Sequence, residues 1–288
     1  MESWTRTGPV VVEVDGQVDG RRIVDYACRE AMRSGAELVL AAPYQPYELL
    51  TSDRQSPRDA LRTATAWVRQ LAGTDLRLGA VAVEGSRLQV LARVARNARQ
   101  LVVGRTPVRR PQRLVTAHGN IFLTARTGCP VVVVPTSWRP SELDQKVAVG
   151  IDGTELSLEA AEFAFQAAGE RRGELTVVHA QHTPRDHRDG VGLSVQETLA
   201  GWAEKYPRVK LTRFLTSRPV VEALVQEGAQ AGLVIVGAPA GALPIGDPVA
   251  RQAVSGLSCP VAVVPHHVVA PERIVLSAHA AQSAENPA

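Results

Sequence analysis

Residues 9–16 read PVVVEVDG, and residues 146–153 read KVAVGIDG. In each stretch an apolar run ends in Asp-Gly, at Asp15 and at Asp152. An apolar run of this length predicts a buried strand, and the Asp-Gly pair predicts the turn that closes it. Because the same opening occurs twice in one chain, the sequence predicts a repeated domain.

The elements that follow the two openings come in the same order. Both copies end in a strand preceded by Cys-Pro, CPVVVVP at 129–135 and CPVAVVP at 259–265. Gly35 and Gly173 follow the first helix of each copy, and we expect both to end that helix with a positive φ. In the first copy the sequence predicts helices at 20–34, 60–71 and 88–98, and strands at 37–42, 76–84, 100–104 and 131–134. In the second copy it predicts helices at 155–171, 195–205 and 220–229, and strands at 174–180, 209–215, 232–237 and 261–264.

Strands that alternate with helices predict an α/β fold, with one doubly wound, parallel, five-stranded sheet in each copy. We expect a flavodoxin-type strand order, with domains at residues 1–137 and 145–267. A polar linker at 136–145 joins them, and residues 268–288 read as a flexible C-terminal tail. The length of 288 residues fits two domains.

Composition argues against several kinds of partner. The 32 basic and 29 acidic residues nearly balance, so no nucleic acid is expected. The apolar runs are far shorter than a membrane span and the N-terminus lacks a signal sequence, which predicts a cytoplasmic protein. Cys28, Cys129 and Cys259 have no metal-type spacing, so no metal site and no disulfide framework is predicted.

Ligands of open α/β sheets bind at the carboxyl ends of the strands, where the winding direction switches. We expect Asp15 and Gly104 to line that crevice in the first copy, and Asp152 and Gly237 in the second. A carboxylate there can accept a hydrogen bond from an adenine amino group or a ribose hydroxyl, and a glycine lets backbone N–H groups approach a phosphate. The alternative is that Asp-Gly is simply a turn and each glycine simply begins a helix.

The whole pattern resembles the universal stress protein family. The strings VVVEVDG, EGSRLQVLARVARNARQLVVG and GCPVVVVP carry the resemblance in the first half, and VAVGIDGT, LVIVG and SCPVAVVP carry it in the second. It implies an adenine nucleotide alpha hydrolase-like fold and a site for ATP or another adenine nucleotide. It also implies that the two final strands pair, so that one tandem chain forms an internal pseudo-dimer, with a homodimer as the alternative.

The phosphate loop that the resemblance implies is degenerate in both copies. After Gly104 the first copy has Pro107 where a second glycine belongs, and proline has no N–H to offer a phosphate. Arg105 opens an arginine-rich loop, which either holds an anion by charge or is a solvated loop. The second copy keeps Gly237, but its loop is shorter, and its remaining glycines are Gly241 and Gly246.

These features predict a cytoplasmic regulatory or binding protein of the universal stress type that binds adenine nucleotide weakly or not at all. We expect no catalytic residue, because His118 has no nucleophile or carboxylate spaced to work with it. The partner would be a regulatory protein of unknown identity. The alternatives are an ATP-binding sensor that hydrolyses ATP slowly, and a protein-interaction scaffold that has lost its ligand.

Overall fold

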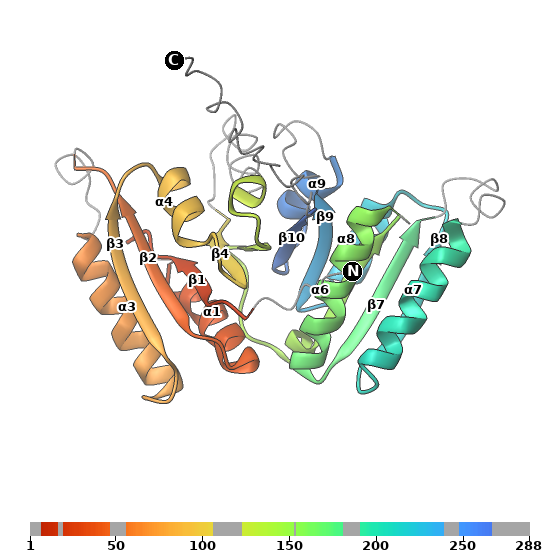
Figure 1. The fold of residues 1–288 in the computed structure, drawn as a ribbon, viewed down its shortest axis with the longest axis horizontal. Coiled ribbons are helices and arrows are strands. Elements are labelled where there is room, and N and C mark those ends of the chain that lie inside the picture. The colour runs from red at the N-terminus through yellow and green to blue at the C-terminus, as the bar shows by residue number, and fades with distance from the viewer. Residues whose placement is uncertain are drawn as a thin grey trace, which may run out of the picture.

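The structure is a computed structural model that describes residues 7–16, 20–46, 56–105, 123–152, 154–180, 191–238 and 248–266. Two halves lie side by side, and their strands and helices follow one another in the same order up to the fourth strand of each (Figure 1). The first comprises β1 (Val10–Glu13), α1 (Gly20–Ser34), β2 (Leu38–Tyr44), α3 (Pro57–Ala72), β3 (Leu78–Glu84), α4 (Arg87–Val94), β4 (Gln100–Gly104) and β5 (Val131–Val134). The second comprises β6 (Lys146–Ile151), α6 (Glu155–Arg171), β7 (Glu174–Ala180), α7 (Val191–Lys205), β8 (Lys210–Thr216), α8 (Val220–Gly228), β9 (Leu233–Ala238), α9 (Pro248–Gly256) and β10 (Val261–Pro265). The predicted tail at 268–288 lies outside the described residues.

All described strands form one sheet, in the order β3-β2-β1-β4-β5-β10-β9-β6-β7-β8. Neighbouring strands within each half are parallel, whereas β5 and β10 are antiparallel, with Val132 opposite Ala262. The predicted pairing of CPVVVVP with CPVAVVP is therefore confirmed. Because these two all-apolar strands pair with each other, neither remains an exposed sheet edge.

The predicted class of fold is confirmed, but the strand order is 3-2-1-4-5 in each half and not the flavodoxin-type order. In a flavodoxin-type sheet the third strand would lie on the far side of β1, yet β3 pairs with β2 at the end of the sheet. The burial of the two strands matches their positions, since Ala80 to Ala82 and Glu84 of β3 are exposed at the end of the sheet, whereas Gln100 to Val103 of β4 are all buried. β4 takes the central position beside β1, and the switch in winding falls between these two strands.

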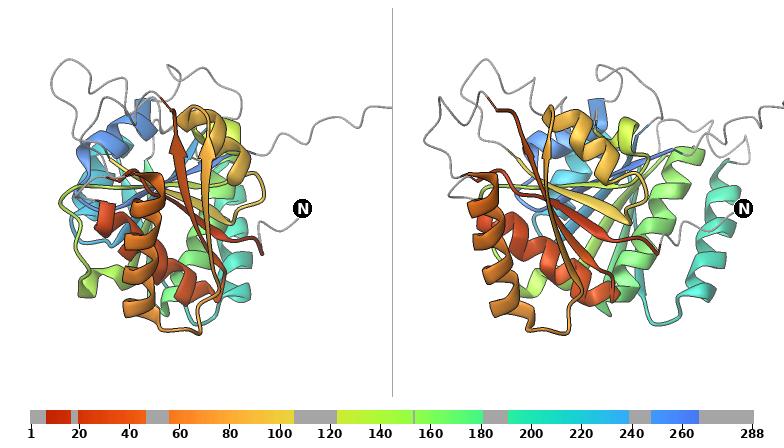
Figure 2. Two further views of the ribbon diagram at one scale, coloured as in Figure 1. Left: turned by 90° about the vertical axis from the view of Figure 1, so that its left-hand side faces the viewer. Right: turned by 60° about the vertical axis from the view of Figure 1, so that its left-hand side comes forward.

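Helices cover both faces of the sheet (Figure 2). One core lies between the sheet and the helices α1, α3, α6 and α7, and the other lies between the sheet and α4, α8 and α9. Each core contains residues from both halves, and both consist mainly of Val, Leu and Ala. Aliphatic side chains thus fill both cores in a protein that has few aromatic residues.

The ends of the two first helices differ from each other. Gly35 follows α1 with φ of 65°, as predicted. After α6 the left-handed residue is Arg172, with φ of 51°, so the prediction for Gly173 is wrong. Gly173 serves packing, because a Cβ there would lie 1.8 Å from the carbonyl oxygen of Gln145.

Candidate functional site

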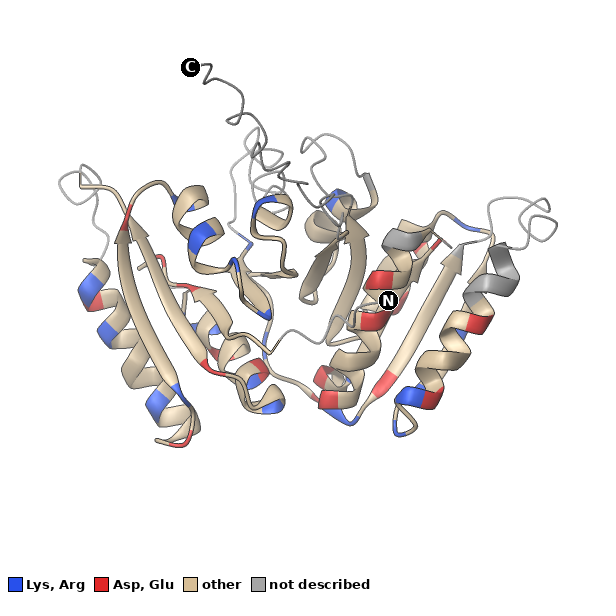
Figure 3. Ribbon diagram, viewed as in Figure 1, with Lys and Arg blue, Asp and Glu red and all other residues tan. Residues whose placement is uncertain are grey.

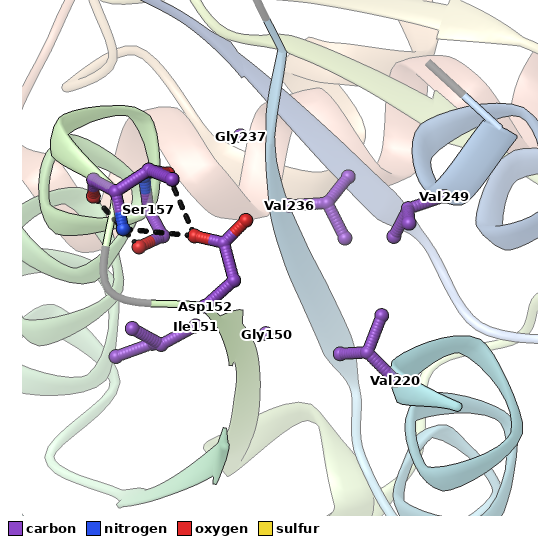
Figure 4. Close-up of a pocket in the computed structure, with 9 residues that line it drawn as sticks. Gly150, Ile151, Asp152, Ser157, Val220, Val236, Gly237 and Val249 are labelled. Atoms are coloured by element: carbon purple, nitrogen blue, oxygen red, sulfur yellow. Dashed lines mark hydrogen bonds between the residues drawn. The ribbon is translucent and has the colours of Figure 1, made fainter. Parts of the chain in front are cut away.

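A cavity of about 110 Å³ lies where β6 and β9 end, at the predicted switch point of the second half. Figure 4 shows the side chains around it, which come from β6, β9 and the starts of the helices α6, α8 and α9. One wall is polar and the opposite wall is aliphatic. Its lining comprises Gly150, Ile151, Asp152, Thr154, Ser157, Val220, Val236, Gly237 and Val249.

Asp152 provides the charge of the polar wall. Its Oδ1 accepts hydrogen bonds from the backbone N–H of Thr154 (3.0 Å) and from the Thr154 hydroxyl (2.6 Å), while the other oxygen faces the side of Val236 (Figure 4). Burial raises the pKa of Asp152, but these hydrogen bonds and one from Ser157 outweigh burial and lower the pKa overall. The carboxylate is therefore held ionised, as a hydrogen-bond acceptor beside the N-terminus of α6.

Thr154 is the N-cap of α6, and its side chain accepts a hydrogen bond from the backbone N–H of Ser157. The sequence analysis did not predict the hydroxyls of Thr154 and Ser157 as parts of this site. Thr154 could have been recognised, since a threonine directly after Asp-Gly and before a helical run is a typical N-cap.

The opposite wall is formed by Val220, Val236 and Val249, one each from α8, β9 and α9. At Gly150 a Cβ would approach Leu224 Cδ1 to 2.9 Å, so glycine here allows α8 to pack closely against β6 below the cavity. An ionised acceptor facing three branched aliphatic side chains suits a flat ring with an N–H or O–H donor at one edge.

The equivalent crevice of the first half contains an ion pair. The strand registers place Glu13 where the second half has Gly150, and Arg87 begins α4 as Val220 begins α8. Arg87 Nε and Nη2 donate to the two carboxylate oxygens of Glu13, at 2.5 and 2.7 Å. Glu13 is 7% exposed. At these two positions the first half thus has a bidentate ion pair, with a buried carboxylate and an Arg87 side chain that is 41% exposed, where the second half has glycine and valine.

Glu13 and Arg87 were not predicted as site residues. A glutamate inside the apolar run at 10–14 was the available signal, because a buried carboxylate requires a partner. Its partner lies 74 positions away in the chain, which a sequence pattern does not reveal.

Two predicted site residues of the first half, Gly104 and Arg105, take part in packing and in contacts between the halves. At Gly104 a Cβ would lie 2.4 Å from Ile23 Cδ1, so glycine here allows α1 to pack against β4. Arg105 Nη1 donates to the carbonyl oxygens of Val254 (2.9 Å) and Leu257 (2.7 Å), at the C-terminal end of α9 in the second half. Arg105 therefore joins the two halves and supports a helix C-terminus.

The remaining predicted residues divide between the crevices and the undescribed segments. Asp15 is exposed at the end of β1, and its charge helps to raise the pKa of Arg87 against the lowering effect of burial. Asp152 and Gly237 come together in the cavity of the second half. Gly241 and Gly246, like the arginine-rich loop after Arg105, lie outside the described residues.

Two negative findings apply to the part of the chain that the structure describes. No helix there is long and apolar enough to cross a membrane. Within the same residues, no group of three or more His, Cys, Asp or Glu side chains could hold a metal ion.

Two doubly wound halves, each with its switch point beside its first strand and joined through their last strands, define a tandem α/β protein. Residues 145–265 match the model of the Universal stress protein family. The universal stress protein Rv2005c of Mycobacterium tuberculosis H37Rv is 27% identical over 253 residues, which cover 79% of this chain and 86% of that protein. A universal stress protein of Mycolicibacterium smegmatis is 27% identical over 267 residues, with coverage of 82% and 88%.

Among solved structures, a universal stress protein from Archaeoglobus fulgidus DSM 4304 has a TM-score of 0.68. It is 15% identical and the match covers 92% of this chain and 98% of that one, which shows that the fold is shared. The second half of the chain therefore carries a universal stress protein domain, and the chain is similar over most of its length to universal stress proteins. The two halves repeat one fold, in the tandem arrangement that the sequence predicts.

Proposed function

We propose that this protein is a cytoplasmic, non-catalytic regulatory protein of the universal stress type, and that its second half binds an adenine nucleotide or nucleoside weakly. The observation that carries the proposal is the contrast between the crevices. The crevice of the second half has a cavity beside Asp152, whereas the Glu13–Arg87 ion pair occupies the corresponding place in the first half. We further propose that residues 1–137 and 145–267 are the two domains, of which the first is structural.

The chemistry of the cavity supports an adenine-type ligand. The exocyclic amino group of adenine and the ribose hydroxyls are donors that an ionised Asp152 can accept, and the valine wall provides an apolar surface for the ring. A phosphate chain would have to extend toward Gly237 and the shortened loop that follows it in the sequence.

Two features support weak binding. The cavity of about 110 Å³ is smaller than the roughly 300–1,000 Å³ usual for small-molecule sites. Thr154 already occupies one oxygen of Asp152, which leaves the other for a ligand. Among the described lining residues Asp152 alone is ionisable, which favours binding over acid–base chemistry.

The proposal is tested by mass spectrometry of ligands released from freshly purified protein, followed by calorimetry with adenosine, AMP and ATP. We expect at most one weakly bound ligand per chain. ATP co-purifying near one per chain would contradict weak binding. Steady release of ADP from ATP, lost in the Asp152→Ala variant, would favour the slow ATPase instead.

Replacing Asp152 by alanine is expected to weaken adenosine binding roughly ten- to a hundredfold, as usual for loss of a hydrogen bond to a charged group. Asp15→Ala is the matched control, since it removes the equivalent aspartate of the first half, and we expect no change. Calorimetry on both variants measures this difference. An equal effect of the two substitutions would show that the ligand does not distinguish the halves.

Exchanging the residues of the ion pair with their counterparts in the other crevice is expected to move the site. The double variant Gly150→Glu/Val220→Arg places the ion pair in the second half, where Leu224 must shift, and we expect binding to be lost there. The reverse exchange, Glu13→Gly/Arg87→Val, opens the first crevice and is expected to add a second binding event. Calorimetric stoichiometry measures both, with circular dichroism as the check on folding. Unchanged stoichiometry in both doubles would refute the assignment of the site to this crevice.

A further inference from the structure

The two ends of the sheet carry different residues. β3 ends it in the first half and β8 in the second, and no other described strand pairs with their outer edges. From Leu78 to Val83, β3 has no charged residue and no proline, and this strand is almost wholly tan in Figure 3. β8 carries Lys210 and Arg213. Charged residues and proline are the usual protection of an edge strand, so β3 is unprotected and β8 is protected.

The backbone of β3 is ready to pair outward. Arg77 accepts a hydrogen bond from the backbone N–H of Leu38, and Gly85 donates to Tyr44, so the odd-numbered residues of β3 face β2. The even-numbered residues therefore turn their backbone N–H and C=O groups outward. They are Leu78, Ala80, Ala82 and Glu84.

The side chains of β3 fit a second β3 in antiparallel orientation. Val81 is the midpoint of the strand and is 36% exposed. Pairing about Val81 puts Val81 opposite itself and Gly79 opposite Val83, while Glu84 meets Leu78 rather than another Glu84. The same pairing of two β8 strands would put Arg213, their midpoint, opposite Arg213, and like charges in that position repel.

We propose that two copies of this chain associate through antiparallel pairing of β3 with β3, centred on Val81, so that one sheet continues through both molecules. This interface is independent of the proposed nucleotide site. It lies at the opposite end of the first half from the β5–β10 junction. A self-complementary strand with a twofold axis through its midpoint forms a closed dimer.

A cysteine at position 81 tests both the partner and the register. In the proposed dimer the two copies of residue 81 form a non-hydrogen-bonded pair with Cα atoms about 4.5 Å apart, within the range of disulfides. Val81→Cys is therefore expected to cross-link under mild oxidation. Val83→Cys, whose copies would be roughly 13 Å apart, is the matched control and is expected not to. The native cysteines are buried and do not compete.

Sedimentation of the full-length chain over a range of concentrations gives the second readout. Val81→Lys places two lysines opposite each other and is expected to raise the dimer dissociation constant roughly tenfold or more. Leu215→Lys adds the same charge at an exposed position of β8 and is expected to leave it unchanged. A monomeric wild type, equal cross-linking of both cysteine variants, or a dimer insensitive to Val81→Lys would overturn the proposal. Pairing of β3 only with a strand of another protein would overturn it as well.

Discussion

Replacing Glu30 by glutamine is expected to lower the free energy of unfolding by about 3–5 kcal/mol, because it leaves the buried guanidinium of Arg171 without its carboxylate. Glu30 lies on α1 of the first half and Arg171 on α6 of the second. Their side chains are 6% and 2% exposed, and Arg171 Nη2 donates to Glu30 Oε1 at 2.7 Å. The pair therefore joins the halves at a place where water cannot replace either partner.

The contacts around the pair explain why removing Glu30 is expected to cost more stability than removing Arg171. Arg33 Nη1 also donates to Glu30 Oε1, at 2.7 Å, so Glu30 keeps one cation when Arg171 is removed. Arg171 has no second carboxylate at hydrogen-bond distance among its described contacts, and donates otherwise to Ala167 O and the Tyr26 hydroxyl. Arginine does not lose its proton in proteins, so it cannot escape the penalty by neutralisation. Arg171→Met is therefore expected to cost less than Glu30→Gln.

Urea denaturation of the single variants and of Glu30→Met/Arg171→Met measures these effects. The double variant removes both charges and is expected to recover most of the loss, since buried ion pairs are often replaceable by apolar residues of similar size. Glu174→Gln, which breaks an exposed ion pair with Lys210, is the surface control and is expected to change little. A double variant as unstable as Glu30→Gln would show that the loss does not come from an unpaired buried charge.

The pair also predicts a dependence on pH. Burial raises the pKa of Glu30, but Arg171 and Arg33 outweigh it and lower the pKa overall from the ordinary 4.5. A carboxyl with a lowered folded-state pKa contributes stability that is complete above its unfolded value and is lost as the pH falls through the folded value. Asp144, which faces Arg33 at 3.6 Å, acts oppositely because burial raises its pKa. The stability difference between wild type and Glu30→Gln should therefore shrink in acid, below pH 4.5.

The sequence predicted what depends on local pattern. Apolar runs and Gly or Pro boundaries placed the strands, and the repeated Cys-Pro strands predicted the β5–β10 pairing. Strand order depends on which strands pair, and a pattern read along the chain does not show the neighbours of a strand, so the position of β3 was missed. The switch point was nevertheless placed correctly, because both strand orders put it beside β1.

The candidate site shows the same limit. Asp152 was found because a turn signal is local. Glu13 and Arg87 pair over 74 positions, and Arg105 contacts α9 over 149, so a pattern read along the chain reveals neither partner. The contrast between the crevices, which carries the proposed function, therefore needed the fold.

Replacing Gly173 by alanine is expected to lower the free energy of unfolding by about 2–4 kcal/mol, at or above the upper end of the usual cost of overpacking. Its Cβ would lie 1.8 Å from the Gln145 carbonyl oxygen and 2.8 Å from the carbonyl carbon, so the backbone itself would have to move. Gln145 ends the short 3₁₀ helix Glu142–Gln145 that leads from the first half into β6. A shift there displaces the first strand of the second half.

Gly201→Ala is the matched control, because Gly201 lies in α7 with nothing within 4 Å of a Cβ. Alanine favours a helix interior over glycine by about 0.5–1 kcal/mol, so this variant is expected to be slightly more stable than wild type. Urea midpoints of the two variants compare the same chemical change at a packed and at an open position. If Gly173→Ala also matched or exceeded wild type, the contact between α6 and the linker would not constrain the start of β6. The opposite signs expected here would show that Gly173 is required by the approach of two backbones and not by its own φ.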